Sequence, residues 1–385
     1  MRCRVKNKAR ILYLVNHLRY GGAEIGLLTT LKNIDRARFD CSVVSVEKKG
    51  EVAEEIESAG IPVTYLNTRS ALYNLPAILA VLDIIKKERP DILHTSLFYS
   101  NFFGRIAALM LFGPKPIIIT EERSMYTEKR FYHVIIDNLL SHVTDRIIAC
   151  SKSVVDFTAR QEGIRKEKFH LIYNAVDSTR FDIPETKDAI RRRRGFSERD
   201  FIVGTVGSII PKKGHKFLID ACAGLAGDIP ELKLVIVGDG EIRTRLERYV
   251  SAQGLAQKIK FPGQRKDVPE IVKMMDVFVL PSLQEGFPRT LVEAMYEALP
   301  VCAARISGIP ELIRDGENGF LFEPGNVTEI AEKIFMLYNN ADLRNRIGAS
   351  ARRTIESGYL PADYLKSLEG LYVDLLKRGT SKARW

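Results

Sequence analysis

The chain has 385 residues, enough for two domains with full hydrophobic cores. Its 45% hydrophobic content is ordinary for a globular protein, and no apolar run approaches the roughly 20 residues that a membrane-spanning helix needs. The net charge of +10 favours anionic partners such as a nucleotide or an anionic lipid. We expect no nucleic-acid partner, because no motif of interleaved basic and aromatic residues is present.

Cysteine usage and the N-terminus bear on the compartment. Five cysteines, an odd number, are scattered along the chain and are expected to be small core residues rather than disulfides or metal ligands: Cys3, Cys41, Cys150, Cys222 and Cys302. The basic N-terminus precedes an apolar run, 11–15, that is too short for the core of a signal peptide. We therefore expect a cytoplasmic protein.

Short apolar runs alternate with helical patterns along the whole chain, which predicts an α/β protein with parallel sheets. In the first half we expect strands at 11–16, 41–46, 63–66, 92–94, 116–120, 146–150 and 170–173, and helices at 23–33, 76–88, 101–111 and 134–142. In the second half we expect strands at 202–207, 233–237, 260–261, 277–280, 301–303 and 319–322, and helices at 217–225, 242–253, 268–275 and 291–299. Three further helices, at 330–339, 343–355 and 362–376, end the chain.

The halves are expected to divide near 182–199, where no buried strand is predicted. Four successive arginines, Arg191 to Arg194, occur there. Such a run is usually a solvated helix face or linker, and phosphate binding is the minority interpretation. Two α/β halves joined by a hinge indicate a cleft between them.

The stretch 277–301 combines a buried strand, a loop and a helix. Glu285 lies in the loop, and Glu293 lies one turn into the helix that Pro288 introduces. The N–H groups of the first helical turn lack intrahelical partners, and the helix dipole is positive there, so a phosphate is favoured. The two carboxylates are suited to accept hydrogen bonds from sugar hydroxyls. A solvated pair of glutamates is the alternative.

This stretch, PSLQEGFPRTLVEAM, resembles the signature of the retaining family 4 glycosyltransferases, in which two glutamates are separated by seven residues. The resemblance implies the GT-B architecture: two Rossmann-like domains facing each other across a cleft, with the last helix crossing back to the N-terminal domain. It implies an acceptor-binding domain at 1–181, a nucleotide-sugar-binding domain at 182–360 and the crossing helix within 361–385.

The resemblance also implies roles for single residues. Glu285 holds the donor sugar as a catalytic residue, Glu293 holds the ribose, and the backbone of Thr290 and Leu291 binds the diphosphate. The other members of this donor-binding turn are Gly286 and Phe287.

Three further segments are similar to donor-binding parts of the family. Gly21 and Gly22 follow the first strand and match a glycine pair near the donor diphosphate and the acceptor; a tight turn is the alternative. Lys213 matches a catalytic lysine on the phosphates, whereas Ser208 stands where arginine is usual. Gly238 and Asp239 match a turn that lies near the nucleotide in the family. The alternative is that Asp239 is only the N-cap of the following helix.

The N-terminal half departs from the family. Many members have a histidine after a middle strand, but here Glu121, Glu122 and Arg123 follow the strand at 116–120. We expect Arg123 to be catalytic by stabilising negative charge on the leaving diphosphate. His94, at a strand end, is the other candidate, with a structural role as its alternative.

The expected function is transfer of a sugar from a UDP- or GDP-sugar to a glycan or lipid-linked acceptor, with retention of anomeric configuration, in cell-surface polysaccharide or glycolipid synthesis. No metal or other cofactor is expected. An epimerase of sugar-nucleotides with the same fold and a non-catalytic glycan-binding protein are the alternatives.

We also expect peripheral contact with the inner membrane surface. The motive is positive charge combined with apolar and aromatic residues in the segments 72–76 and 98–103. The alternative is that these aromatic residues belong to the core.

Overall fold

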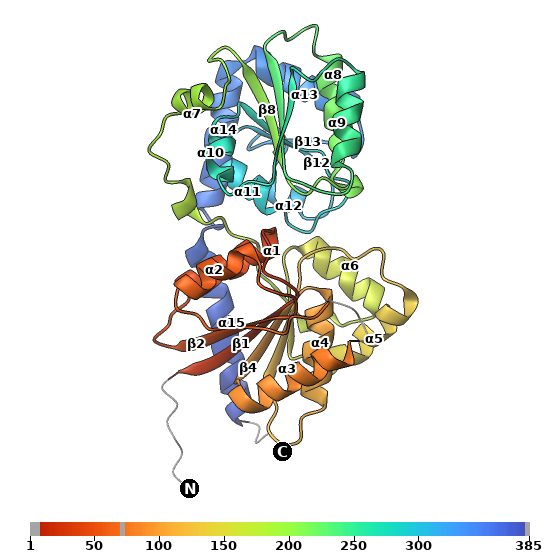
Figure 1. Cartoon of the computed structure of the whole chain (residues 1–385), viewed down its shortest axis with the longest axis vertical. Coiled ribbons are helices and arrows are strands. Elements are labelled where there is room, and N and C mark those ends of the chain that lie inside the picture. Colours follow the sequence, from red (N-terminus) through yellow and green to blue (C-terminus); the bar gives the residue numbers. More distant parts are fainter. Residues whose placement is uncertain (1–7, 70–73, 382–385) are drawn as a thin grey trace. The chain divides into compact units, whose positions relative to one another are not determined.

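The structure, a computed structural model, describes residues 8–69 and 74–381 (Figure 1). The chain divides into two compact units. Unit 1 comprises the described residues up to Tyr173 together with those from Pro361 onward, and unit 2 comprises Asn174–Leu360. Residues 174–181, expected in the N-terminal domain, lie in unit 2.

Unit 1 is a parallel α/β unit with the strand order β3-β2-β1-β4-β5-β6-β7. Its strands are β1 (Ala9–Val15), β2 (Phe39–Ser45), β3 (Val63–Tyr65), β4 (Ile92–Ser96), β5 (Ile117–Glu122), β6 (Arg146–Ala149) and β7 (Phe169–Leu171). Its helices are α1 (Gly22–Asn33), α2 (Glu51–Ser58), α3 (Leu75–Glu88), α4 (Phe98–Leu109), α5 (Phe131–Ser141), α6 (Lys152–Glu162) and α15 (Pro361–Ser381), with a 3-10 turn η1 (Lys166–Lys168).

The helices of unit 1 form two groups. Helix α1 packs against α2 and α15, whereas α3, α4, α5 and α6 pack against one another in that order. Strand β1 lies between β2 and β4, so the chain proceeds to one side from β1 to β3 and returns to the other side at β4. Such a switch point places the loops after β1 and β4 beside a crevice at the carboxyl edge of the sheet.

Unit 2 repeats this plan with the strand order β10-β9-β8-β11-β12-β13. Its strands are β8 (Phe201–Val206), β9 (Leu232–Val237), β10 (Ile259–Gly263), β11 (Val277–Leu280), β12 (Val301–Ala304) and β13 (Phe320–Phe322). Its helices are α7 (Lys187–Arg193), α8 (His215–Gly224), α9 (Arg243–Ala252), α10 (Val268–Lys273), α11 (Arg289–Tyr296), α12 (Ile309–Leu312), α13 (Val327–Asn339) and α14 (Ala341–Glu356), with 3-10 turns η2 (Ser178–Phe181) and η3 (Pro211–Lys213). Its switch point lies between β8 and β11.

The predicted α/β architecture with two Rossmann-like halves is confirmed. Each expected strand range overlaps a strand, and β8 and β11 are buried along their whole length, as near-continuous apolar runs predict for parallel strands. The described cysteines, Cys41, Cys150, Cys222 and Cys302, are buried and unbridged, while Cys3 lies outside the described residues.

The arginine run is only partly the expected solvated face: Arg192 and Arg193 are exposed, whereas Arg191 and Arg194 are not. Arg191 is buried on α7, donates to the Met274 carbonyl at 2.9 Å, and pairs with Asp276 at 2.6 Å. Arg193 and Arg194 both pair with Glu270. The interpretation as a phosphate site receives no support, because carboxylates of unit 2 neutralise these guanidinium groups.

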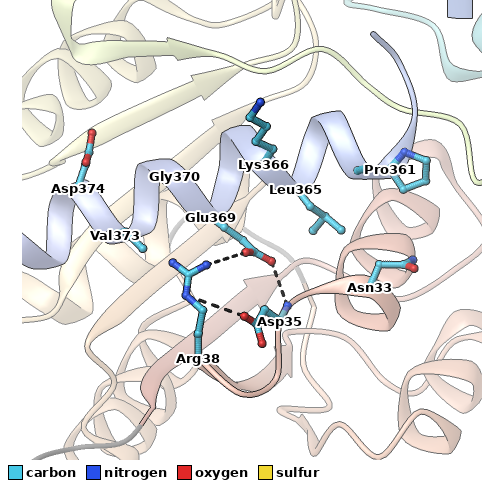
Figure 2. Close-up of a pocket in the computed structure, with 11 residues that line it drawn as sticks. Asn33, Asp35, Arg38, Pro361, Leu365, Lys366, Glu369, Gly370, Val373 and Asp374 are labelled. Carbon is cyan, nitrogen blue, oxygen red and sulfur yellow. Dashed lines mark hydrogen bonds and ion pairs between the residues drawn. The ribbon is translucent and has the colours of Figure 1, made fainter. Parts of the chain in front are cut away.

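The last helix belongs to unit 1. Glu369 of α15 accepts hydrogen bonds from the Asp35 backbone N–H at 3.0 Å and from Arg38 at 3.3 Å, as Figure 2 shows in the groove beside this contact. On its other side, Tyr372 is fully buried against the sheet, where its hydroxyl bonds Tyr13 at 2.9 Å. Helix α15 is therefore part of the core of unit 1.

The two segments on which the expected membrane contact was based, 72–76 and 98–103, differ in burial where the structure describes them. Phe102 and Phe103 are buried in the core, so that part of the motive is wrong. Leu72 and Tyr73 lie outside the described residues, and Leu75 is exposed. Within the described residues, no helix is long and apolar enough to cross a bilayer.

Candidate functional site

The switch point of unit 2 gathers the loop after β8 and the loop after β11. In the first loop, Ser208 is exposed and Lys213 is half-buried. In the second loop, Glu285 is buried. Lys213 Nζ lies 2.6 Å from Glu285 Oε1, and the buried Ser282 hydroxyl donates to the same oxygen at 2.7 Å. A cation and a carboxylate far apart in sequence thus meet at the edge where α/β sheets bind ligands.

Backbone contacts hold these two loops in register. The Leu283 N–H donates to the Lys212 carbonyl at 2.8 Å. Gly214 has a φ of +64°, and a Cβ atom there would lie 2.0 Å from the Pro281 carbonyl oxygen. Because only glycine permits this approach, the position of Lys213 opposite Glu285 depends on it.

The loop after β9 lies against the loop after β8. Gly238 has a φ of +142°, and a Cβ atom there would lie 1.9 Å from the Gly207 oxygen. Asp239 accepts from the Gly240 N–H at 2.7 Å and pairs with Arg243 at 3.1 Å. The N-cap of α9 is Ile242, so the alternative role for Asp239 as that cap is wrong.

The N-terminus of α11 completes the group in unit 2. Val292 donates to the Pro288 carbonyl, so Thr290 and Leu291 precede the first intrahelical bond of the turn. Glu293, one turn along, is buried near Arg180 and Arg289. Burial raises the pKa of its carboxyl, and the two guanidinium groups oppose that rise.

The segment 174–176 anchors the turn that contains Phe287. Asn174 Nδ2 donates to the Phe287 carbonyl at 2.6 Å, and Arg289 donates to the Ala175 carbonyl at 2.9 Å. The Phe287 ring stacks on Tyr359 with 5.7 Å between centroids. These contacts explain why residues after 173 belong to unit 2. The second of these bonds directs the Arg289 guanidinium toward the anchoring segment.

Two neighbours of the site were missed by sequence reasoning. His215 is buried at the start of α8 beside the backbone of Gly207 and Ser208, where burial, and then the charge of Lys213, lower its pKa to about 4. Ser282 binds Glu285. The only signal in the sequence was that His215 lies close to Lys213 and Ser282 close to Glu285. The burial of His215 could not be predicted, because it depends on how the loops pack.

A second group lies at the switch point of unit 1. Gly21 is the N-cap of α1 and Gly22 its first residue. A Cβ atom at Gly21 would lie 2.4 Å from a carboxylate oxygen of Glu24. The Glu24 side chain is buried, and its Oε1 lies 3.3 Å from His17 Nδ1. The glycine pair thus leaves room for a carboxylate of its own helix.

His94, Glu121 and Arg123 form a connected polar group beneath this point. His94 lies 3.2 Å from Glu121 and bonds the Tyr372 hydroxyl of α15. Arg123 makes a two-pronged pair with Glu121, with both contacts at 2.9 Å. Burial opposes ionisation, but Arg123 and then His94 hold the pKa of Glu121 well below its usual range.

Leu97 adjoins this group and has a strained backbone. Its φ is +74°, in a region that non-glycine residues rarely adopt, and it lines a small cavity with Glu24, His94 and Arg123. Strain of this kind concentrates at functional sites. In the part of the chain that the structure describes, no cluster of three or more His, Cys, Asp or Glu residues is arranged to hold a metal ion.

The sequence-predicted residues thus fall into two groups. Unit 2 brings together Ser208, Lys213, Gly238, Asp239, Glu285, Gly286, Phe287, Thr290, Leu291 and Glu293. Unit 1 contains Gly21, Gly22 and Arg123.

The fold is shared with solved structures. HepE of Anabaena in complex with UDP-glucose is 24% identical, with a TM-score of 0.84 over 94% of this chain and 99% of that one. A glycosyltransferase from Rickettsia africae is 22% identical, with a TM-score of 0.83 over 96% of this chain and 99% of that one. At these identities the likeness shows the fold alone.

Two family models match most of the chain. The model described as Glycosyltransferase Family 4 matches residues 20–180, and the one described as Glycosyl transferases group 1 matches residues 186–354. The chain is a GT-B glycosyltransferase.

Relatives of this glycosyltransferase are named as enzymes of polysaccharide and glycolipid synthesis. The UDP-Gal:alpha-D-GlcNAc-diphosphoundecaprenol alpha-1,3-galactosyltransferase of Escherichia coli is 26% identical over 315 residues, 80% of this chain and 81% of the relative. The capsular polysaccharide biosynthesis glycosyltransferase CapM of Staphylococcus aureus is 24% identical over 359 residues, 90% of this chain and 93% of the relative.

Proposed function

We propose that this glycosyltransferase moves a sugar from a UDP-sugar to a lipid-linked or glycan acceptor with retention of anomeric configuration. The observation that supports this most is the Lys213–Glu285 pair at the switch point of unit 2, beside the N-terminus of α11. The solved relative HepE binds UDP-glucose, and the Escherichia coli relative is named for UDP-Gal and a diphosphoundecaprenol acceptor. The motif shared with retaining enzymes supports retention.

The geometry supports a division of roles in the donor site. The bond between the anomeric carbon and the diphosphate oxygen breaks with its electron pair left on that oxygen, so negative charge grows there. The Lys213 ammonium and the N–H groups of Thr290 and Leu291 stabilise this charge. Glu293 accepts from the ribose hydroxyls and Glu285 from the sugar. The acceptor hydroxyl bonds the anomeric carbon from the same face as the leaving group and passes its proton to the departing diphosphate oxygen, so that the products are the glycoside and UDP.

We propose Arg123 as a further stabiliser of the leaving diphosphate, with Glu121 holding its guanidinium in place. No metal is required by this scheme, because the leaving charge has cationic and N–H partners from the chain. Activity should therefore persist in EDTA. If EDTA abolished activity and added Mg²⁺ or Mn²⁺ restored it, that part of the proposal would be contradicted.

The test is incubation of the full chain with labelled UDP-glucose, UDP-galactose, UDP-N-acetylglucosamine and GDP-mannose, with and without polyprenyl-diphosphate-sugar acceptors. We expect a retained glycosidic product with one UDP-sugar. An epimerised donor would identify an epimerase, and binding without turnover would identify a non-catalytic protein.

Removal of the Lys213 ammonium tests the assigned chemistry. Lys213→Ala should lower kcat/KM by about 100-fold or more, the usual cost of removing one such charge-stabilising donor. Lys212→Ala, which removes the adjacent exposed lysine, is the matched control and should change kcat/KM less than about two-fold. Equal activity in both variants would refute the donor-site assignment.

The proposed setting is the inner membrane surface, where a lipid-linked acceptor would be found. The acceptor named for the Escherichia coli relative supports this setting.

A further inference from the structure

Exposed hydrophobic side chains of this chain are unevenly distributed. Ten large ones are exposed among the described residues, and eight of them lie on α3, α4, α5 or directly after α4: Leu75, Leu79, Leu109, Met110, Phe112, Phe131, Ile135 and Leu139. Leu283 and Phe335 are the other two. Because α3 packs against α4 and α4 against α5 (Figure 1), the eight belong to one helical layer of unit 1.

Helix α5 is apolar on its outer face as well as its inner face. Leu140 is buried and Ile136 packs against the core, as a surface helix requires. On the outside, Phe131, Ile135 and Leu139 recur every fourth residue with exposed fractions of 77%, 53% and 63%. A surface helix normally has polar residues there. We call these three residues the α5 face.

The exposed charges of the helical layer that contains the α5 face are mostly positive. The single acidic residue of α5, Asp137, is buried and paired with Arg105 and Lys129. Over residues 74–142 the exposed acidic residues are Asp83 and Glu128, whereas the exposed cationic residues are Lys86, Lys87, Arg89, Lys115 and Arg130. The layer therefore combines an apolar face with an excess of positive charge among its exposed side chains.

Aromatic side chains cluster where α5 begins. Phe131 lies edge-on to Tyr132, and Tyr132 is edge-on to His133, which in turn contacts Phe98. Arg130 donates to the Tyr132 hydroxyl at 3.3 Å. Aromatic rings with one polar end are favoured at the boundary between lipid and water.

We propose that the α5 face docks on an anionic bilayer surface, with Phe131, Ile135 and Leu139 entering the boundary between headgroups and acyl chains. A helix with apolar residues on one face and flanking cations binds such surfaces. The inference deepens the proposed function, because α5 is the helix that follows β5 and Arg123 in the chain, so docking at the start of α5 brings the loop after β5 toward a lipid-linked acceptor. Vesicle binding does not depend on that function.

A second copy of the chain fits this face less well. In a two-fold dimer the same patch meets itself, so two layers with the same excess of positive charge would be brought together. An anionic lipid surface meets those cations with opposite charge. The structure therefore favours lipid as the occupant.

Cosedimentation of the full chain with vesicles tests the proposal. Vesicles of phosphatidylethanolamine and phosphatidylglycerol should bind the protein, and phosphatidylcholine vesicles should bind it less. The double variant Phe131→Ser, Ile135→Ser should lower the partition coefficient by about ten-fold or more, because two apolar side chains no longer enter the lipid. Phe335→Ser, which removes an exposed phenylalanine of α13 in unit 2, is the matched control and should change it less than about two-fold.

Further arms separate charge from apolar insertion and from self-association. Arg130→Glu should weaken binding to the anionic vesicles but leave the weaker phosphatidylcholine binding unchanged. Circular dichroism and thermal unfolding check that each variant is folded. Absence of vesicle binding at every salt concentration, or equal binding by the double variant and the wild type, would overturn the proposal. The proposal would also be overturned if analytical ultracentrifugation showed the wild type to be a dimer and the double variant a monomer, while neither protein bound vesicles. Failure of sugar transfer would leave all these readouts unchanged.

Discussion

Glu293 shows how one side chain is prepared for a polar ligand. It is buried one turn inside α11, with Arg180 and Arg289 nearby, so its charge is desolvated yet compensated. A carboxylate in such surroundings accepts hydrogen bonds without competition from bulk water.

Glu293→Gln should weaken UDP binding by about 10-fold or more, because a hydrogen bond to a charged group contributes roughly 1.5–3 kcal/mol. The raised pKa of Glu293 adds a pH dependence: binding should decline as the pH falls toward that pKa, since the protonated carboxyl is a poorer acceptor. Isothermal calorimetry of wild type and variant across pH measures both. Equal affinity at all pH values would show that Glu293 does not contact the nucleotide.

His215 is the residue whose burial links the site to acid stability. Burial lowers its pKa from 6.5 to about 4, so in that window the unfolded chain binds a proton that the folded chain does not. The contribution of neutral His215 to the free energy of unfolding is therefore fully present above pH 6.5. It is lost as the pH falls toward 4, by roughly 3 kcal/mol in total.

His215→Gln should flatten the fall in free energy of unfolding between pH 6.5 and 4, measured by urea titration. His142→Gln, which removes an exposed histidine, is the control and should leave the slope as in the wild type. The same slope in both variants would mean that His215 is not the source of the acid sensitivity.

At the scale of elements, α7 is attached to the sheet of unit 2 by one acidic residue. Asp276, just before β11, pairs with Arg191 at 2.6 Å and with Lys187 at 2.8 Å, and it accepts from the Ile202 N–H at the start of β8 at 2.7 Å. The helix is thereby held beside the two strands that form the switch point.

Arg191→Ala should destabilise unit 2 by about 3 kcal/mol, because it removes a buried guanidinium and leaves the half-buried Asp276 carboxylate without its closest partner. Arg192 is exposed and 3.9 Å from Glu198, so Arg192→Ala should cost less than about 0.5 kcal/mol. Urea denaturation compares the two, and UDP affinity should stay constant in both. Equal stabilities would contradict the structural role of the run.

At the scale of the whole molecule, the last helix completes the core of the first unit. The Tyr372 hydroxyl bonds Tyr13 of β1 and His94 of β4, the two strands of the switch point. Unit 1 is thus built from both ends of the chain.

Tyr372→Phe should destabilise unit 1 by roughly 1–3 kcal/mol, because it leaves buried polar groups without a partner while the ring volume stays. Hydrogen exchange should accelerate in β1 and β4 but remain constant in β8 and β11. Tyr338→Phe, which removes a hydroxyl that contacts Glu231 at 3.4 Å in unit 2, is the control. Faster exchange in both units alike would argue against separate cores.

Every strand and most of the helices could be predicted from the sequence, although α2, α6, α7 and α12 were not. Apolar runs with intervening helical periods follow from local backbone geometry, so the strand ranges and the α/β class could be predicted. The turn from Glu285 to Glu293 could be placed because a strand, a loop and a helix are contiguous in sequence there.

Contacts between residues far apart in the chain could be found only in the folded structure. The pairing of Lys213 with Glu285, of Arg191 with Asp276 and of His94 with Tyr372 joins residues far apart in sequence. The apolar outer side of α5 was equally hidden, because helical periodicity identifies faces but not which of two apolar faces is covered. Such partners depend on strand order and helix packing, which emerge only when the whole chain minimises its buried, unpaired polar groups and its exposed apolar surface together.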